Sequence, residues 1–458
     1  MQLRFERALL PGGIARDVQV EIGDDGQITR VEAGVDRARG AWHTGLALPG
    51  MPNLHSHAFQ RAMAGSAEVA ARAQGSFWGW RDVMYRFVGR LTPEDMAAIS
   101  AFAYLEMLEA GYTSVAEFHY VHHDTNGAPY ADVLTLAESV RHAARRVGMR
   151  HLLLPTLYQT GNFGGEPVAA TQRRFHNDTQ AFLDLLAALE QRATGLERTG
   201  VALHSLRAVP PAALAAVAAA ARGAATPIPV HIHVAEQARE VADCIAVHGR
   251  RPVEYLVGGG YLDPNWCLVH ATHVTPEELR GVAASGAVVG LCLTTEANLG
   301  DGRFPLDEFI ALGGRYGIGS DSHVSIDPRE ELRTAEYNLR LWRERRVLAT
   351  TADDPHAGSA LWSRAVAGGS QALGFGASGL APGAPGDVLL VDTSRAEFAG
   401  LTDKALLDAW VFAPRPGALQ RVWVAGEAVV VEGRHRAREA VETQYRASLE
   451  RLTRDGQA

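Results

Sequence analysis

The chain has 458 residues, of which 47% are hydrophobic and 21% are charged, and this is the composition of an ordinary globular protein with a large core. Its formal net charge of −8 gives no electrostatic reason to expect nucleic acid or a membrane surface as a partner. Residues 1–7 do not lead into an apolar signal core, no apolar run is long enough for a membrane span, and three widely spaced cysteines argue against a disulfide framework, so we expect a cytoplasmic protein.

Short strand-like alternations occupy both ends of the chain. Residues 17–22 alternate in this way near turns at 12–13 and 24–26, and residues 386–392 and 421–426 form similar runs towards the other end. We therefore expect a small β-sandwich domain built from residues 1–47 and 378–440. A C-terminal helical tail is expected at 441–458.

Between these ends, apolar strand-like segments alternate with helical segments eight times. The predicted strands lie at 46–57, 112–121, 151–159, 200–209, 228–236, 266–274, 287–296 and 315–324, and the predicted helices at 93–110, 131–147, 172–196, 211–221, 237–248, 276–285, 305–312 and 327–343. This alternation predicts an α/β fold, a (β/α)8 TIM-type barrel, as a catalytic domain over residues 48–377. Because such barrels carry their chemistry at the carboxyl ends of the strands, polar residues there are the site candidates.

The first predicted strand ends in His55-Ser56-His57. Residues two apart on a strand face the same side, so both imidazoles can reach one ion. Neutral imidazole is a common ligand for zinc and its neighbours. A single pair of this kind can occur by chance in a chain with 18 histidines, and it gains weight because three later predicted strands also end in titratable residues.

The fifth predicted strand offers two histidines and a carboxylate. His231 and His233 share one face, and His233 lies nearer the carboxyl end, so we favour it as a metal ligand. His231 would lie deeper, where a hydrogen-bonded barrel histidine is the favoured interpretation. Glu236 should stand at the start of the following loop.

The sixth and eighth predicted strands add His270 and Asp321. We interpret His270 as a group that orients water, whereas His273 stays open between the surface and the site. An aspartate after an apolar run can simply cap a helix. Opposite three histidines, Asp321 is favoured as a ligand that also accepts a proton from the bound water.

Lys404 is the only lysine of the chain. The predicted barrel therefore has no lysine that could be carboxylated to bridge two metal ions, and Schiff-base catalysis there is excluded. A single metal ion per chain is expected.

Together these residues resemble the amidohydrolase superfamily in its mononuclear deaminase branch. The longer strings at 52–63, 294–302 and 319–323 are similar to those of members that act on a linear amidine, and one departure is Leu293, where proline is expected. The resemblance covers essentially the whole chain. It implies one Zn²⁺ per chain bound by His55, His57, His233 and Asp321, although Fe²⁺ accepts the same ligands.

The resemblance also implies catalytic roles. Asp321 would take the proton of the attacking water, Glu236 would pass protons to the departing nitrogen, and His270 would orient the attacking oxygen. Five residues are implied as substrate contacts: Gln60, Arg81, Tyr120, His204 and Arg207. A homodimer is expected as well.

Two arginines fit the substrate class that the resemblance implies. Arg207 closes the fourth predicted strand, and Arg81 lies on a long loop predicted at 58–90. The resemblance implies a small dicarboxylate substrate, and arginine suits bidentate capture of its carboxylates. A deaminase of purines, pyrimidines or other aromatic bases is the alternative, and these arginines argue against it. A metal-binding relative without activity is disfavoured because ligands, proton shuttle and orienting histidine are all present.

Overall fold

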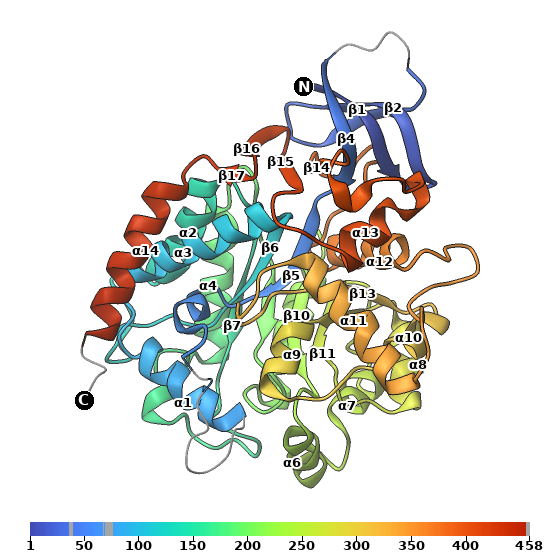
Figure 1. The fold of residues 1–458 in the computed structure, drawn as a ribbon. Helices are drawn as coiled ribbons and strands as arrows, with labels where there is room; N and C mark the ends of the chain where they lie inside the picture. Colours follow the sequence, from blue (N-terminus) through green and yellow to red (C-terminus); the bar gives the residue numbers. More distant parts are fainter. Residues whose placement is uncertain (36–39, 67, 69–76, 455–458) are drawn as a thin grey trace.

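The computed structural model describes residues 1–35, 40–66, 68 and 77–454, with the backbone alone at 77–79. The described chain forms a barrel surrounded by helices and, beside it, a separate sheet built from both chain ends (Figure 1). Among the described helices, none combines the length and the apolarity that crossing a membrane requires.

Eight parallel strand positions form the barrel, which closes because β13 pairs with β5 and β5 pairs with β6. Its strands are β5 (Met51–Ser56), β6 (Tyr112–His119), β7 (Arg150–Leu157), β8 (Glu197–Thr199), β9 (Val201–Leu203), β10 (Val230–Val234), β11 (Trp266–His270), β12 (Val288–Leu291) and β13 (Arg315–Ile318). Both β8 and β9 pair with β7, on either side of Gly200, so they share one position. The expected TIM-type barrel is confirmed.

Helices surround the barrel (Figure 1). They are α1 (Phe77–Val88), α2 (Pro93–Ala110), α3 (Thr135–Val147), α4 (Thr179–Arg192), α5 (Pro211–Gly223), α6 (Ala238–His248), α7 (Pro252–Gly258), α8 (Pro276–Ser285), α9 (Leu293–Leu299), α10 (Leu306–Ala311), α11 (Pro328–Arg343), α12 (Ala357–Ala372), α13 (Leu406–Phe412) and α14 (Arg438–Thr453), with 3-10 turns η1 (Ala58–Met63), η2 (Ala170–Gln172), η3 (Ala396–Phe398) and η4 (Asp403–Ala405). Local signals set their ends. At α2, Thr92 and Asp95 form a capping box, and Gly111 ends the helix with a φ of 108°.

The two chain ends meet in one mixed sheet. Its strands are β1 (Gln2–Leu10), β2 (Gly13–Ile22), β3 (Ile28–Glu32), β4 (Ala41–Pro49), β14 (Val388–Val391), β15 (Leu419–Val424), β16 (Glu427–Val431) and β17 (Arg434–His435). They are hydrogen-bonded in the order β17-β16-β15-β14-β4-β1-β2-β3, so the pairing of β4 with β14 joins the ends. This confirms that both ends build one β unit beside the barrel. Helix α14 fills most of the expected tail, and residues 455–458 lie outside the described residues.

The first predicted strand, 46–57, is in fact two strands in different sheets. β4 ends at Pro49 in the flanking sheet, and β5 begins at Met51 in the barrel. A Cβ atom on Gly50 would collide with the side chain of Thr113, so only glycine lets the chain pass β6 this closely. The loop predicted at 58–90 contains η1 and α1, and its residues 67 and 69–76 lie outside the described part of the chain.

The seventh predicted strand, 287–296, ends at Leu291 and gives way to α9. The turn is helical because side chains accept its first N–H groups: Glu296 accepts from Cys292 at 2.9 Å, and Glu331 accepts from Thr294 at 3.1 Å. The fourth predicted strand likewise stops at Leu203, so Arg207 lies beyond the strand rather than at its end.

Candidate active site

Four predicted ligands come together where β5, β10 and β13 end. His55 lies on β5 and His57 just after it, His233 lies on β10, and Asp321 follows β13. Backbone pairing joins the first and last of these segments, because the Asp321 N–H donates to the His55 carbonyl at 3.0 Å and the His57 N–H donates to the Asp321 carbonyl at 3.1 Å. Asp321 has a φ of 46°, an uncommon conformation that is found more often at functional sites.

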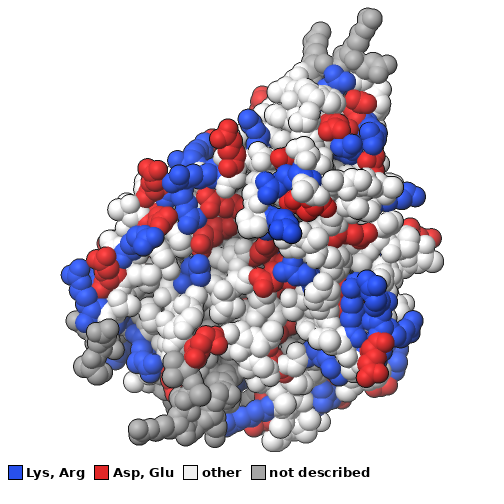
Figure 2. Space-filling view, in the orientation of Figure 1, with Lys and Arg blue, Asp and Glu red and all other residues white. Residues whose placement is uncertain are grey.

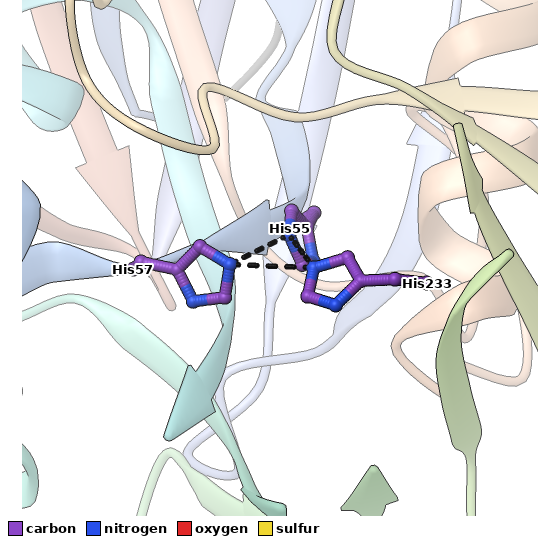
Figure 3. A group of neighbouring side chains, drawn as sticks. All are labelled: His55, His57 and His233. Atoms are coloured by element: carbon purple, nitrogen blue, oxygen red, sulfur yellow. Dashed lines mark hydrogen bonds between the residues drawn. The ribbon is translucent and has the colours of Figure 1, made fainter. Parts of the chain in front are cut away.

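The three imidazoles point towards one another (Figure 3). Nε2 of His55 lies 3.1 Å from Nε2 of His57 and 3.0 Å from Nε2 of His233, and the last two atoms are 3.4 Å apart. The Oδ1 atom of Asp321 lies 3.3 Å from Nε2 of His55 and 3.4 Å from Nε2 of His57. All four side chains are buried.

Hydrogen bonds on the far side of the rings decide which nitrogen faces this cluster. Nδ1 of His57 donates to the Phe118 carbonyl at 3.0 Å, and Nδ1 of His233 donates to the His204 carbonyl at 2.9 Å. Both Nε2 atoms therefore present lone pairs. Burial lowers the pKa of all three rings, that of His55 to about 3, so the rings stay neutral. Lone pairs that converge beside a carboxylate fit a divalent metal ion.

The predicted acid–base residues lie beside the ligands. Nε2 of His270 lies 3.9 Å from Oε1 of Glu236 and 3.9 Å from Oδ2 of Asp321. Burial raises the pKa of Glu236 to about 7, and such a carboxyl can accept and donate protons at neutral pH. Burial lowers the pKa of His270, but the carboxylates of Glu236, Glu296 and Asp321 outweigh this effect and raise that pKa to about 10.

The residues expected to contact substrate line one pocket together with the acid–base residues. The lining includes Gln60, Arg81, Tyr120, His204 and Arg207 as well as His57, His233, Glu236, His270 and Asp321. The side-chain amide of Gln60 donates to Oη of Tyr120 at 3.0 Å. The structure therefore brings every predicted site residue to one place, and the individual roles stay predictions.

Apart from Tyr120, sequence reasoning did not assign the aromatic residues of this pocket to the site. The unassigned residues are Trp80, Tyr85, Tyr158 and Phe175. Arg207 Nη1 donates to Oη of Tyr158 at 3.4 Å, and the Arg81 guanidinium lies 5.5 Å from the centre of the Tyr85 ring. Gln172 donates to both hydroxyls, at 2.7 Å to Tyr158 and 3.3 Å to Tyr85. Tyr158 closes the third predicted strand, so its position was the signal that could have found it.

Two carboxylates that carried no signal in the sequence hold backbone segments of the site, the half-buried Glu240 and the buried Glu117. Glu240 accepts the backbone N–H groups of Ala235 at 3.2 Å and Glu236 at 3.0 Å. Glu117 accepts from Oγ of Ser56 at 2.5 Å and from the N–H of Ala58 at 2.8 Å, and so holds the chain on both sides of His57.

The two histidines with open interpretations lie apart from the ligand cluster. His231 is fully buried, and its Nε2 donates to the Ala372 carbonyl at 2.9 Å, which fits a hydrogen-bonded barrel histidine. His273 is not among the described residues that line the pocket.

Comparison with known proteins places this geometry in a family. The amidohydrolase family model matches residues 46–429. The chain belongs to the amidohydrolase family. The resemblance carried by the histidine and aspartate motifs is thus confirmed.

This amidohydrolase is similar to known deaminases over most of its length. It is 50% identical over 436 residues to the formimidoylglutamate deiminase of Pseudomonas aeruginosa, and the match covers 95% of each chain. It is 28% identical over 392 residues to a 5-methylthioadenosine/S-adenosylhomocysteine deaminase of Natronomonas pharaonis, covering 85% of this chain and 82% of that relative. The family and the nearer of these two relatives make the chain a hydrolase that acts on C–N bonds.

Solved structures agree with this assignment. An amidohydrolase from Brucella melitensis superposes with a TM-score of 0.93 at 43% identity, covering 98% of this chain and 99% of that one. An adenosine deaminase from Xanthomonas campestris with bound zinc superposes with a TM-score of 0.82 at 22% identity, covering 99% and 98%. The second likeness shows the shared fold alone.

Proposed function

We propose that this amidohydrolase is a formimidoylglutamate deiminase, which converts N-formimino-L-glutamate and water to N-formyl-L-glutamate and ammonia in histidine degradation. The observation that carries the proposal is a single pocket that holds His57, His233 and Glu236 together with Arg81 and Arg207. Such a pocket offers a hydrolytic centre and two cations to one small molecule. The 50% identity to the Pseudomonas enzyme supports the same substrate.

One zinc ion per chain is the metal that we infer for the site, with His55, His57, His233 and Asp321 as its ligands. An ion bound there would lower the pKa of a coordinated water from about 15.7 to about 7. Ferrous iron accepts the same ligands, so elemental analysis of the purified protein decides between them.

Asp321 and His270 act on the attacking water. As the oxygen of the water forms its bond to the formimino carbon, one of its protons goes to Asp321. His270 faces the same carboxylate with its Nε2 and orients the oxygen. Both groups are buried, which keeps bulk water from competing for these contacts.

Glu236 carries protons to the departing nitrogen. The proton taken by Asp321 passes through Glu236 to the imino nitrogen, and the hydroxyl proton of the tetrahedral adduct follows as the C–N bond breaks. The carbonyl of the formyl group forms, and ammonia leaves. A carboxyl with a pKa of about 7 suits both proton transfers.

The glutamate end of the substrate is assigned to the arginines. Arg81 and Arg207 are the partners for its two carboxylates, because each guanidinium can bind a carboxylate through two N–H groups. Gln60, Tyr120 and His204, which line the same pocket, are assigned as further substrate contacts. Tyr158 and Tyr85 contact the guanidinium groups of Arg207 and Arg81. Their presence in the pocket is therefore no specific argument for an aromatic base as the substrate.

Ammonia release by purified protein tests the proposal. The enzyme is incubated with formiminoglutamate, guanine or cytosine, and Glu236→Gln serves as the control for contaminating activity. Release from formiminoglutamate alone supports the deiminase, whereas release from a base alone favours the aromatic-base deaminase. The homodimer stays a prediction, which light scattering on the same sample tests.

A further inference from the structure

Helix α9 carries a buried carboxylate that the proposed mechanism leaves without a role. Glu296 stands in the first turn of α9 and is 2% exposed. Its Oε1 accepts the Cys292 N–H at 2.9 Å and lies 3.2 Å from Nδ1 of His270. Its Oε2 is buried and makes no hydrogen bond within the described chain. Capping of α9 accounts for the first contact but not for the second.

His270 needs such a contact because its backbone is strained. It ends β11 with a φ of 69°, and Ala271 follows with a φ of 49°, both in the left-handed region that non-glycine residues seldom adopt. The ring stacks on His233, with 5.6 Å between ring centres and 13° between planes. A hydrogen bond at Nδ1 sets the rotation of such a ring and thereby the direction in which Nε2 points.

The helix that carries Glu296 is itself anchored next to the ligand Asp321. Oγ1 of Thr295 lies 3.0 Å from Oγ of Ser322 and accepts the Ser322 N–H at 3.2 Å. On its other side, Thr294 bonds to Glu331 of α11. These hydrogen bonds fix the position of Glu296, the acceptor for His270, relative to the segment that follows β13.

We propose that Glu296 is a positioning residue, which accepts the Nδ1–H of His270 and so keeps Nε2 of that ring aimed between Glu236 and Asp321. The inference rests on the proposed function, because it assigns Glu296 to the group that orients the attacking oxygen. The proposal gives a chemical role to one residue of the motif at 294–302, most of which forms α9.

Two substitutions of similar size separate the hydrogen bond from mere packing. Glu296→Gln keeps an oxygen that accepts from Nδ1, whereas Glu296→Met fills the same space without an acceptor. Loss of a partner that orients a site histidine costs roughly 10- to 100-fold in activity. The Met variant should lose kcat in that range with KM and bound metal at wild-type levels, and the Gln variant should keep most of kcat. If the Met variant does not fold, Glu296→Asp, whose carboxylate is one methylene too short, takes its place with the same expectation.

A double-mutant cycle asks whether Glu296 acts through His270. In a His270→Asn background the Met substitution should cost nothing further, since effects of residues that act as a unit are not additive. The ¹⁵N signals of the His270 ring, identified by their loss in His270→Asn, add a direct readout. Wild type and the Gln variant should share one Nδ1 chemical shift, and the Met variant should show a different one because the hydrogen bond at Nδ1 is lost.

Glu278 provides a matched control. This carboxylate is 4% exposed and accepts the N–H groups of Thr275 at 2.8 Å and Glu254 at 3.0 Å, without contact to a site residue. Glu278→Met should lower the melting temperature and leave kcat unchanged. Wild-type kcat in Glu296→Met, or an equal loss with and without His270, overturns the inference. A wild-type chain that releases no ammonia from formiminoglutamate overturns the proposed function instead.

Discussion

Oε1 of Glu236 lies 3.9 Å from Nε2 of His270, and the same Nε2 lies 3.9 Å from Oδ2 of the buried Asp321. Glu236 follows β10 and His270 ends β11, and these two barrel strands pair in parallel so that His233 stands beside Val269. The groups assigned to move protons and to orient oxygen therefore meet on one side of the ligand cluster. This relationship leads to the first prediction.

Glu236→Gln should cut turnover by roughly 100- to 10,000-fold, because a positioned acid–base group contributes that much and the amide cannot carry a proton. Metal content should stay at the wild-type level, since Glu236 is not one of the assigned ligands. Ammonia release and elemental analysis on the same preparation check both statements. If the metal is lost together with activity, Glu236 is a ligand instead.

Arg207→Met and Arg81→Met should each lower kcat/KM for formiminoglutamate by tens- to thousands-fold. Removing one partner of a desolvated charge pair costs about 2–5 kcal/mol, and the remaining carboxylate is then left without its cation. A substrate analogue that lacks the matching carboxylate is the control, and its kcat/KM should fall much less. Wild-type efficiency of both variants on the diacid would refute the dicarboxylate assignment.

Purified protein should contain about one divalent ion per chain, because the described residues offer one open set of histidines and a carboxylate and the barrel has no lysine to bridge a second ion. Chelation should abolish ammonia release, and adding back zinc or ferrous iron should restore it. Two tightly bound ions per active chain contradict the mononuclear assignment.

His151, which is not one of the predicted ligands, should make the fold acid-sensitive. Burial lowers the pKa of this ring, which contacts Oη of Tyr104, to about 3. The unfolded chain takes up a proton below pH about 6.5 while the folded chain does not, so this contribution to stability is complete above pH 6.5 and is lost as pH falls towards 3. At pH 5 the loss is about 2 kcal/mol.

Denaturant titrations at pH 7.5 and pH 5 measure that contribution. Between these values the free energy of unfolding of wild type should fall by about 2 kcal/mol more than that of His151→Gln. The exposed His142 on α3, substituted in the same way, is the control and should behave like wild type. Equal losses for wild type and the His151 variant would show that this ring does not set the acid sensitivity.

Much of this protein could be predicted from the sequence because strands and helices impose fixed periods. The spacing of His55 and His57 places both rings on one side of the chain in any fold that makes 55–57 extended. The eight alternations predict a barrel, and a parallel barrel brings all carboxyl ends to one face, which unites His233, His270 and Asp321.

Only the tertiary structure decided where neighbouring segments change partners. Pro49 and Met51 belong to different sheets because Pro49 pairs with β14 and Met51 pairs with β6. Leu293 begins a helix because the distant Glu331 accepts the Thr294 N–H. The Glu296–His270 contact likewise joins residues 26 positions apart. Hydrogen bonds of this kind depend on where remote segments pack, and no local periodicity encodes that.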